Sequence, residues 1–77
     1  MRIKILFFSA AAEVSGTDYI HLEDFQTTDQ VIAHLLEKFP SLSGMNCRFA
    51  LNKVILNESN SLNEGDELAV LPPFSGG

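Results

Sequence analysis

The sequence has a single cysteine, few basic residues and no long apolar run. One cysteine, Cys47, excludes an internal disulfide and fits a reducing compartment, so we expect a cytoplasmic protein. No apolar stretch approaches the about 20 residues that cross a bilayer, so we expect no membrane partner. Five basic residues against ten acidic ones give a net charge of −5. That balance argues against a nucleic-acid partner, because phosphates bind cations.

The composition fits one small α+β domain. The chain has 77 residues, of which 45% are apolar, and a chain of this size buries only about 60% of its unfolded surface. Residues 2–8 alternate in the manner of a strand, which predicts that Ile3, Ile5 and Phe7 face the core. Residues 9–15 predict a short helical turn that stops at Gly16.

Residues 17–23 alternate again and predict a second strand, antiparallel to the first. A helix is then predicted to begin at Thr27, because Thr27 and Gln30 have capping-box spacing. Pro40 ends it, since proline excludes the preceding residue from the helical region. The helix carries apolar residues at helical spacing that we assign to core packing. They are Val31, Ile32, Leu35, Leu36 and Phe39.

The second half of the chain predicts three more strands. Residues 47–51 and 54–56 form a hairpin around the tight turn at residues 52–53. A turn at residues 63–66 leads into the last strand, residues 67–71. The first and last strands can lie side by side and parallel, with the helix across one face. About five strands then form one mixed sheet.

The other face of this sheet is predicted to carry apolar residues close to the C-terminus. An exposed apolar patch of this kind indicates a protein interface. The alternative is that residues 9–15 fold over it. The predicted interface residues are Leu6, Phe8, Ala69, Leu71 and Phe74.

Residues 1–71 are predicted to form the domain and residues 72–77 to form an extended tail. The tail consists of Pro72, Pro73, Phe74, Ser75, Gly76 and Gly77. The two prolines stiffen it, and six residues reach roughly 20 Å when extended. Two glycines remove every Cβ beside the terminal carboxylate, so that it can enter a narrow channel. We hypothesise that the α-carboxylate of Gly77 is the reactive group; the alternative is a frayed tail without function.

The chain resembles the molybdopterin synthase small subunits, a family of ubiquitin-like sulfur carriers that includes the MoaD-like proteins. The resemblance covers the whole chain. It is carried by the Leu6-Phe7-Phe8 opening, the Gly16-Thr17 step, the Leu62-x-x-Gly65-Asp66-Glu67-Leu68 segment and the Pro-Pro-x-Ser-Gly-Gly ending. It implies a β-grasp fold and the role of a non-catalytic, sulfur-donating subunit of a transferase complex.

The resemblance also implies the chemistry and the partners. An adenylating enzyme would use ATP to convert the Gly77 carboxylate into an acyl-adenylate, and a sulfur donor protein would convert that into a thiocarboxylate. The tail would then enter a large catalytic subunit, in a heterotetramer, and give sulfur to cyclic pyranopterin monophosphate. The small subunit itself would hold no cofactor stably.

Two other functions stay open: a sulfur carrier of another pathway, such as thiamine synthesis, or a ubiquitin-like tag or interaction module.

Single residues add no further site. Cys47 is interpreted as structural because buried thiols are usually inert. His21 and His34 lack partners at metal-ligand spacing, so no metal site is predicted, and His34 is expected to face solvent. Asp66 is expected to stabilise its turn.

Overall fold

The computed structural model describes residues 1–73 and has a mixed sheet of five strands in the order β2-β1-β5-β3-β4. The calls on Phe74, Ser75, Gly76 and Gly77 lie outside the described residues. The element order is β1 (Arg2–Phe7), α1 (Ala10–Ser15), β2 (Tyr19–Glu23), α2 (Thr28–Lys38), the 3-10 helix η1 (Pro40–Met45), β3 (Arg48–Leu51), β4 (Val54–Ile55) and β5 (Glu67–Leu71). The predicted β-grasp arrangement is confirmed.

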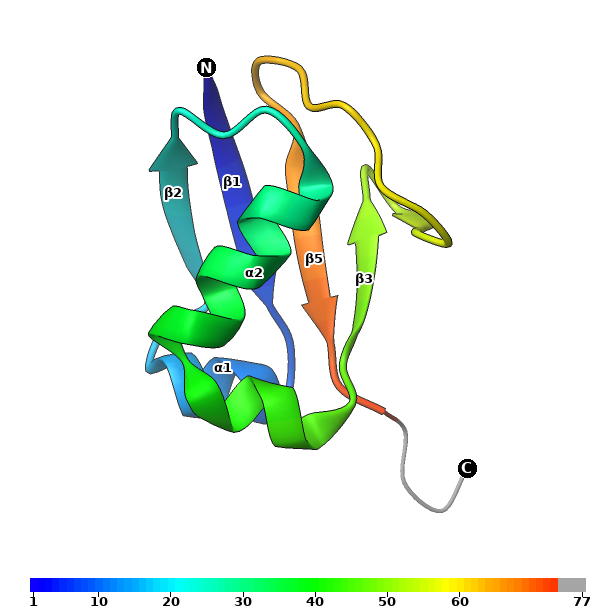
Figure 1. Cartoon of the computed structure of the whole chain (residues 1–77). Helices are drawn as coiled ribbons and strands as arrows, with labels where there is room; N and C mark the ends of the chain where they lie inside the picture. Colours follow the sequence, from blue (N-terminus) through cyan, green and yellow to red (C-terminus); the bar gives the residue numbers. More distant parts are fainter. Residues whose placement is uncertain (74–77) are drawn as a thin grey trace.

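The sheet is built around the parallel pair of β1 and β5, whose side chains toward α2 are buried. Ile5 is opposite Leu68, and Phe7 is opposite Val70. β2 and β3 pair antiparallel to this centre on either side. The helix α2 crosses one face of the sheet (Figure 1), and its Val31 is fully buried in the same cluster as these strand residues. We call this the helix face, and the opposite side the far face.

The predicted start of α2 is confirmed in atomic detail. The Thr27 hydroxyl accepts a hydrogen bond of 3.3 Å from the Gln30 backbone, and the Gln30 side chain accepts one of 3.4 Å from the Thr27 backbone. This capping box satisfies amide donors that have no partner inside the helix. At the other end, the Phe39 ring packs edge-on against Phe7, with 5.6 Å between ring centroids. The helix is therefore fixed to the sheet at the end where β1 and β5 finish.

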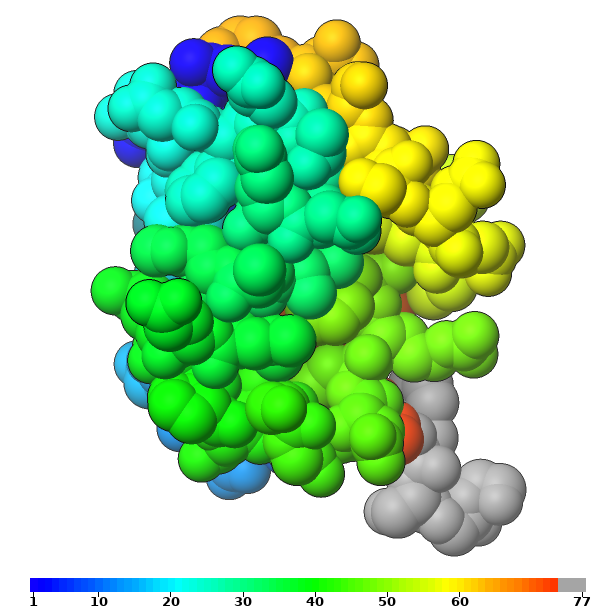
Figure 2. Space-filling view, viewed as in Figure 1, coloured from blue at the N-terminus to red at the C-terminus, as the bar shows by residue number. Residues whose placement is uncertain are grey.

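α1 and η1 close the core below α2. Ala11 of α1 and Leu42 of η1 are both buried in the core cluster. Gly16 ends α1 with a left-handed φ of +79°, a conformation that glycine adopts without steric cost. Figure 2 shows the green helical residues on this side, beside the yellow loop around residue 60. Within residues 1–73, no helix has the length and apolar character that crossing a membrane requires.

The predicted strands are confirmed, with differences of one or two residues at their ends. β1 stops at Phe7, and the next residue joins the strand to α1: the Phe8 carbonyl accepts from the Ala11 amide at 2.9 Å, and the Phe8 amide still donates to the Val70 carbonyl at 3.3 Å. Thr17 belongs to the turn before β2, where its hydroxyl donates to the Tyr19 carbonyl. β3 begins at Arg48, since Cys47 follows the left-handed residue Asn46 that ends η1.

Candidate functional site

The chain leaves the sheet at the C-terminal end of β5. β5 ends at Leu71, and the described part of the tail is Pro72, half-buried, and Pro73, exposed. Leu71 is opposite Arg48 of β3. Prolines cannot donate to a ladder, so the sheet pairing of this segment stops here. The rest of the tail, with the candidate reactive terminus Gly77, lies outside the described residues.

Four of the five predicted interface residues fall within the described chain, and all four lie on the far face. Leu6 is opposite Ala69, and Leu71 is the next far-face residue along β5. Phe8 is held near Leu71 by its hydrogen bond to Val70, and its side chain is 45% exposed. The fifth residue, Phe74, is outside the described residues. An exposed phenylalanine beside half-buried aliphatic residues gives this face an apolar surface near the tail.

The alternative that residues 9–15 cover this surface is wrong. α1 contacts η1 and β1, and its Ala11 belongs to the core cluster that also contains Val31 and Leu35 of α2. The helix therefore closes the end of the core on the helix side and leaves Phe8 exposed.

The register extends this apolar surface across the whole sheet. Tyr19 of β2 is opposite Leu6, and Ala50 of β3 is opposite Ala69. Ile55 of β4 is in turn opposite Ala50, and directly opposed residues share a face. Tyr19 is 50% exposed and Ile55 is 39% exposed, whereas the small Ala50 between them in the register is buried, at 4%. We call the resulting seven residues the apolar patch: Leu6, Phe8, Tyr19, Ala50, Ile55, Ala69 and Leu71.

The sequence analysis missed Tyr19, Ala50 and Ile55 as patch residues, although a signal for the pairing of two of them, Ala50 and Ile55, was present. The two-residue turn Asn52-Lys53 fixes Leu51 opposite Val54 and therefore Ala50 opposite Ile55. Both turn residues have positive φ, 48° and 74°, as such hairpins require. The place of Tyr19 depends on the register between β1 and β2, which a long connection does not specify.

Charged residues border the patch at both ends: the exposed Arg48 is opposite Leu71 beside the start of the tail, and a second group lies on the side away from the tail. Lys4 of β1 is opposite His21 and Glu67 in the neighbouring strands. The Lys4 ammonium lies 4.5 Å from the centre of the Tyr19 ring, and the His21 ring meets the same tyrosine edge-on at 5.6 Å. A cation over an aromatic face is attracted to its π electrons. Lys4 and Tyr19 therefore hold each other at the boundary between the apolar and charged parts of the far face.

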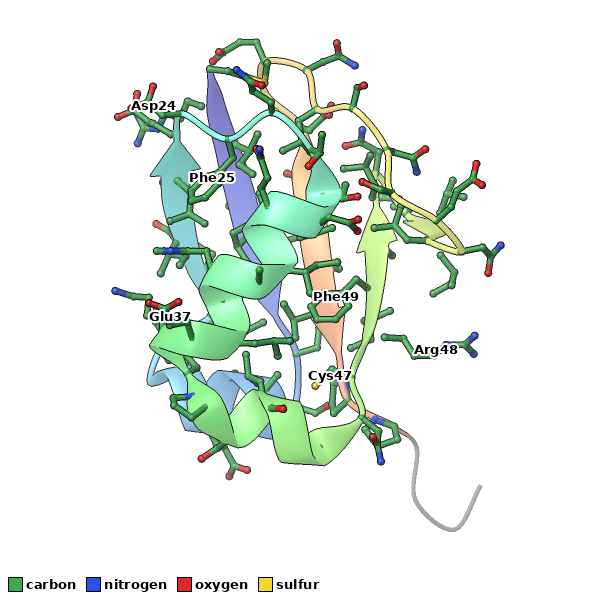
Figure 3. The ribbon with its side chains drawn as sticks, viewed as in Figure 1. Asp24, Phe25, Glu37, Cys47, Arg48 and Phe49 are labelled. Atoms are coloured by element: carbon green, nitrogen blue, oxygen red, sulfur yellow. The ribbon has the colours of Figure 1, made fainter. Side chains whose placement is uncertain are left out.

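Cys47 does not belong to the patch, although the structure brings it closer to the tail than the sequence suggested. It precedes Arg48, which is opposite Leu71, so it lies near the start of the tail in space. Figure 3 shows its sulfur between η1 and β3, whereas Arg48 points away from the sheet. The side chain is partly buried against the core cluster, and this burial raises the pKa of the Cys47 thiol above its ordinary value. A protonated thiol is a weak nucleophile, which supports the structural role.

The expectation for His34 is wrong, and the one for Asp66 is confirmed. His34 is half-buried, and its ring packs against Phe25 at a tilt of 48°, with 5.1 Å between centroids. Asp66 is buried at the turn before β5, where its carboxylate accepts hydrogen bonds from the Asn63 backbone at 2.8 Å and the Asn52 amide at 3.0 Å. Among residues 1–73, no three histidine, cysteine or acidic side chains lie close enough to hold a metal ion.

Comparisons with known proteins agree with this arrangement. The model of the ThiS family matches residues 5–77. The chain belongs to the ThiS family. Two relatives are both named molybdopterin synthase sulfur carrier subunit: one from Chlamydomonas reinhardtii, 35% identical and aligned over 100% of both chains, and one from Haemophilus influenzae, 34% identical over 97% of this chain and 99% of the relative. The family assignment thus includes the tail as well as the domain.

Solved structures of family-like proteins show the same fold. The small archaeal modifier protein 1 from Methanosarcina acetivorans superposes with a TM-score of 0.82 at 22% identity, over 99% of this chain and 96% of that one. A protein-protein complex of subunits 1 and 2 of molybdopterin-converting factor from Helicobacter pylori contains a chain with a TM-score of 0.72 at 22% identity, covering 100% of each. At these identities the likeness establishes the ubiquitin-like fold.

Proposed function

We propose that this chain is the sulfur carrier subunit of a molybdopterin synthase, with the α-carboxylate of Gly77 as its reactive group. The observation that carries the proposal is the match to the ThiS family over residues 5–77. Relatives that bear this subunit's name align along nearly their whole length. The carrier works in the cytoplasm and holds no cofactor of its own, so ATP is consumed by an activating partner.

The chemistry proceeds in two activation steps and one transfer. A carboxylate oxygen of Gly77 attacks the α-phosphate of ATP on an adenylating enzyme, and pyrophosphate leaves. Hydrosulfide supplied by a donor protein then attacks the acyl carbon, AMP leaves with the bonding electrons of the broken C–O bond, and the product is a thiocarboxylate. In the large subunit, this sulfur passes to cyclic pyranopterin monophosphate, and water restores the carboxylate. Glycine at the last two positions leaves the acyl carbon free of side-chain obstruction.

The apolar patch is the surface that would hold the large subunit. It adjoins the point where β5 releases the tail, so a partner that covers Phe8 and Leu71 also receives the residues beyond Pro73. Exposed aromatic and aliphatic side chains on one face are the usual anchors of protein interfaces. The Helicobacter pylori complex supports pairing with a second subunit. We expect a heterotetramer with the large subunit.

Intact-mass measurement tests this function. The purified chain is incubated with the adenylating enzyme, ATP and a sulfur donor. Its mass should rise by the difference between sulfur and oxygen. A chain that lacks Gly77, or one that carries an extra residue after it, should keep its mass. A Ser75→Ala chain, which retains the same terminus, serves as the control and should gain the sulfur. Sulfuration of the extended chain would contradict the proposal.

A protein tag is the second candidate, and one observation favours it: the same fold occurs in a small archaeal modifier protein. A tag would join its Gly77 carboxyl to a lysine amine and form an amide, with loss of AMP from the same acyl-adenylate. Peptide mass spectrometry distinguishes the two products. Lysines that carry the C-terminal residues of this chain support the tag, whereas a free thiocarboxylate that restores pterin sulfuration supports the carrier. A thiocarboxylate that works only in thiamine synthesis would indicate the other sulfur pathway.

A further inference from the structure

The strand β2 forms a long, unpaired edge of the sheet. It has five residues, Tyr19–Glu23, and pairs only with β1 among residues 1–73. Figure 1 shows it at the margin of the sheet, with α2 crossing the interior. The other edge, β4, has only two residues, Val54–Ile55. Short edge strands resist pairing with other chains, whereas a long regular edge is a template for an added strand.

Hydrogen bonds identify the backbone groups that this edge offers. Asp18 and Asp24 point their backbone toward β1, because the Asp18 carbonyl accepts from Phe7 at 2.8 Å and the Asp24 amide donates to Met1 at 3.2 Å. In an antiparallel pair this direction alternates with each residue. The backbone of Tyr19, His21 and Glu23 therefore points outward. The Tyr19 carbonyl already accepts from the Thr17 hydroxyl at 3.2 Å. This hydrogen bond involves only the first of the three outward-pointing residues.

Apolar side chains lie next to this edge on the helix face. Ile20 and Leu22 are only half-buried, although both pack against the core cluster. Figure 3 shows Phe25 between β2 and α2, where its ring packs against His34. An added strand would place alternate side chains over this surface, which gives an apolar contact in addition to the backbone hydrogen bonds.

The charges along the edge determine which strand fits. Asp18, Glu23 and Asp24 are all exposed, and no lysine or arginine occurs in residues 17–24. Two copies of this edge would bring like charges together, which opposes self-pairing. A segment with lysine or arginine beside its apolar residues meets opposite charge instead. We propose that β2 is a second docking surface, separate from the apolar patch, that takes a basic extended segment of a partner protein by strand addition.

The experiment uses the full chain and two synthetic peptides as probes. One peptide alternates lysine with valine, and the other alternates glutamate with valine. Backbone amide exchange is followed by NMR. The lysine peptide should slow exchange of the His21 and Glu23 amides. The Ile20 and Leu22 amides already point toward β1 and should change little. Binding should weaken as salt is raised, because the contact depends on charge.

Three variants make the test specific. His21→Pro removes an outward N–H that nothing in β1 uses, so the fold is kept while the affinity for the lysine peptide falls at least tenfold. The double change Glu23→Lys and Asp24→Lys should reverse the preference to the glutamate peptide and covers the case in which the proline variant fails to fold. Phe8→Asp, on the far face, should leave peptide binding unchanged.

Several results would overturn the proposal. They are equal binding of both peptides, a site that maps to the apolar patch, or loss of binding in Phe8→Asp. Dimerisation of the free chain through β2 would also overturn it, because the edge would then be occupied by a second copy. None of these outcomes affects the sulfuration of Gly77, so failure here is separate from failure of the proposed function.

Discussion

The Asn52 side chain connects two turns through Asp66. Its amide donates a 3.0 Å hydrogen bond to one Asp66 carboxylate oxygen, across 14 residues of sequence. Its carbonyl oxygen accepts from the Glu67 backbone at 3.0 Å. The other Asp66 oxygen accepts from Asn63 at 2.8 Å. The β3–β4 hairpin, which carries Ile55 of the apolar patch, is thus fixed to the start of β5.

Asp66→Ala should therefore destabilise the domain by about 0.5–1.5 kcal/mol, because it removes the acceptor of two partly buried hydrogen bonds. Asp66→Asn keeps a carbonyl oxygen for one of them and should cost less. Glu58→Ala, which removes an exposed loop carboxylate, is the control and should change stability by less than about 0.5 kcal/mol. Urea unfolding followed by circular dichroism measures all three. Equal stability of the Asp66 and Glu58 alanine variants would contradict this account.

Gly65 and Gly44 have similar open surroundings but different backbone conformations. A Cβ would meet no atom within 4 Å at either position, but only Gly65 has a positive φ, +84°. Gly65→Ala should cost about 1–2 kcal/mol from backbone strain alone. Gly44→Ala should be neutral or stabilising by up to about 1 kcal/mol, because alanine restricts the unfolded chain. The unfolding midpoints, at an unchanged denaturant slope, give both values. A stable Gly65→Ala variant would show that the turn can adopt another conformation.

The partly buried Cys47 thiol should react slowly with alkylating reagents at neutral pH. Burial raises its pKa, so the reactive thiolate is scarcer than in the unfolded chain. This difference in pKa also makes the stability of the domain depend on pH. The unfolded thiol loses its proton first, so the free energy of unfolding falls as the pH rises from the unfolded pKa to the folded pKa.

Iodoacetamide labelling, compared between the native and urea-unfolded chain and followed by mass, measures the reactivity. Unfolding curves at neutral and alkaline pH measure the linkage. A Cys47→Ala chain should lose this part of the pH dependence. Native labelling as fast as labelling of the unfolded chain would contradict the protected position and would reopen a chemical role for the thiol.

Local patterns in the sequence were sufficient to predict the elements and their order. Alternation identified the strands, and the Thr27–Gln30 spacing identified the start of α2, because each depends on residues that are close in sequence. The far-face positions of Leu6, Phe8, Ala69 and Leu71 followed from the same alternation. The exposure of the Phe8 side chain could not be predicted from the sequence, because it depends on where α1 packs.

Long-range pairing explains what the sequence could not show. Tyr19 joins the patch because it is opposite Leu6, and Cys47 lies near the tail because Arg48 is opposite Leu71. His34 is covered by Phe25, which lies outside its helix. Each of these relationships depends on the register or packing of separate elements. The proposal for Gly77 is the opposite case, since it depends on the local Gly76-Gly77 sequence and not on the packing of separate elements.

Adjacent residues of β4 give the sharpest test of the apolar patch. Ile55 is opposite Ala50 and lies on the far face, whereas Val54 is opposite Leu51 and lies on the helix face. Val54 is the more exposed of the two, at 67% against 39%. Ile55→Asp should weaken binding to the large subunit by about tenfold to a hundredfold, as expected for an apolar contact worth about 1.4–3 kcal/mol.

Val54→Asp should leave this affinity within about threefold, because surface changes outside an interface have small effects. Phe8→Asp should weaken it at least as strongly as Ile55→Asp, since Phe8 lies closer to the tail. Calorimetric titration with the large subunit measures each affinity, and circular dichroism verifies the fold. Equal losses for Val54→Asp and Ile55→Asp would mean that the hairpin, and not the far face, contacts the partner. Because the two residues are neighbours on opposite faces, any difference between them reports the side of the sheet on which the large subunit binds.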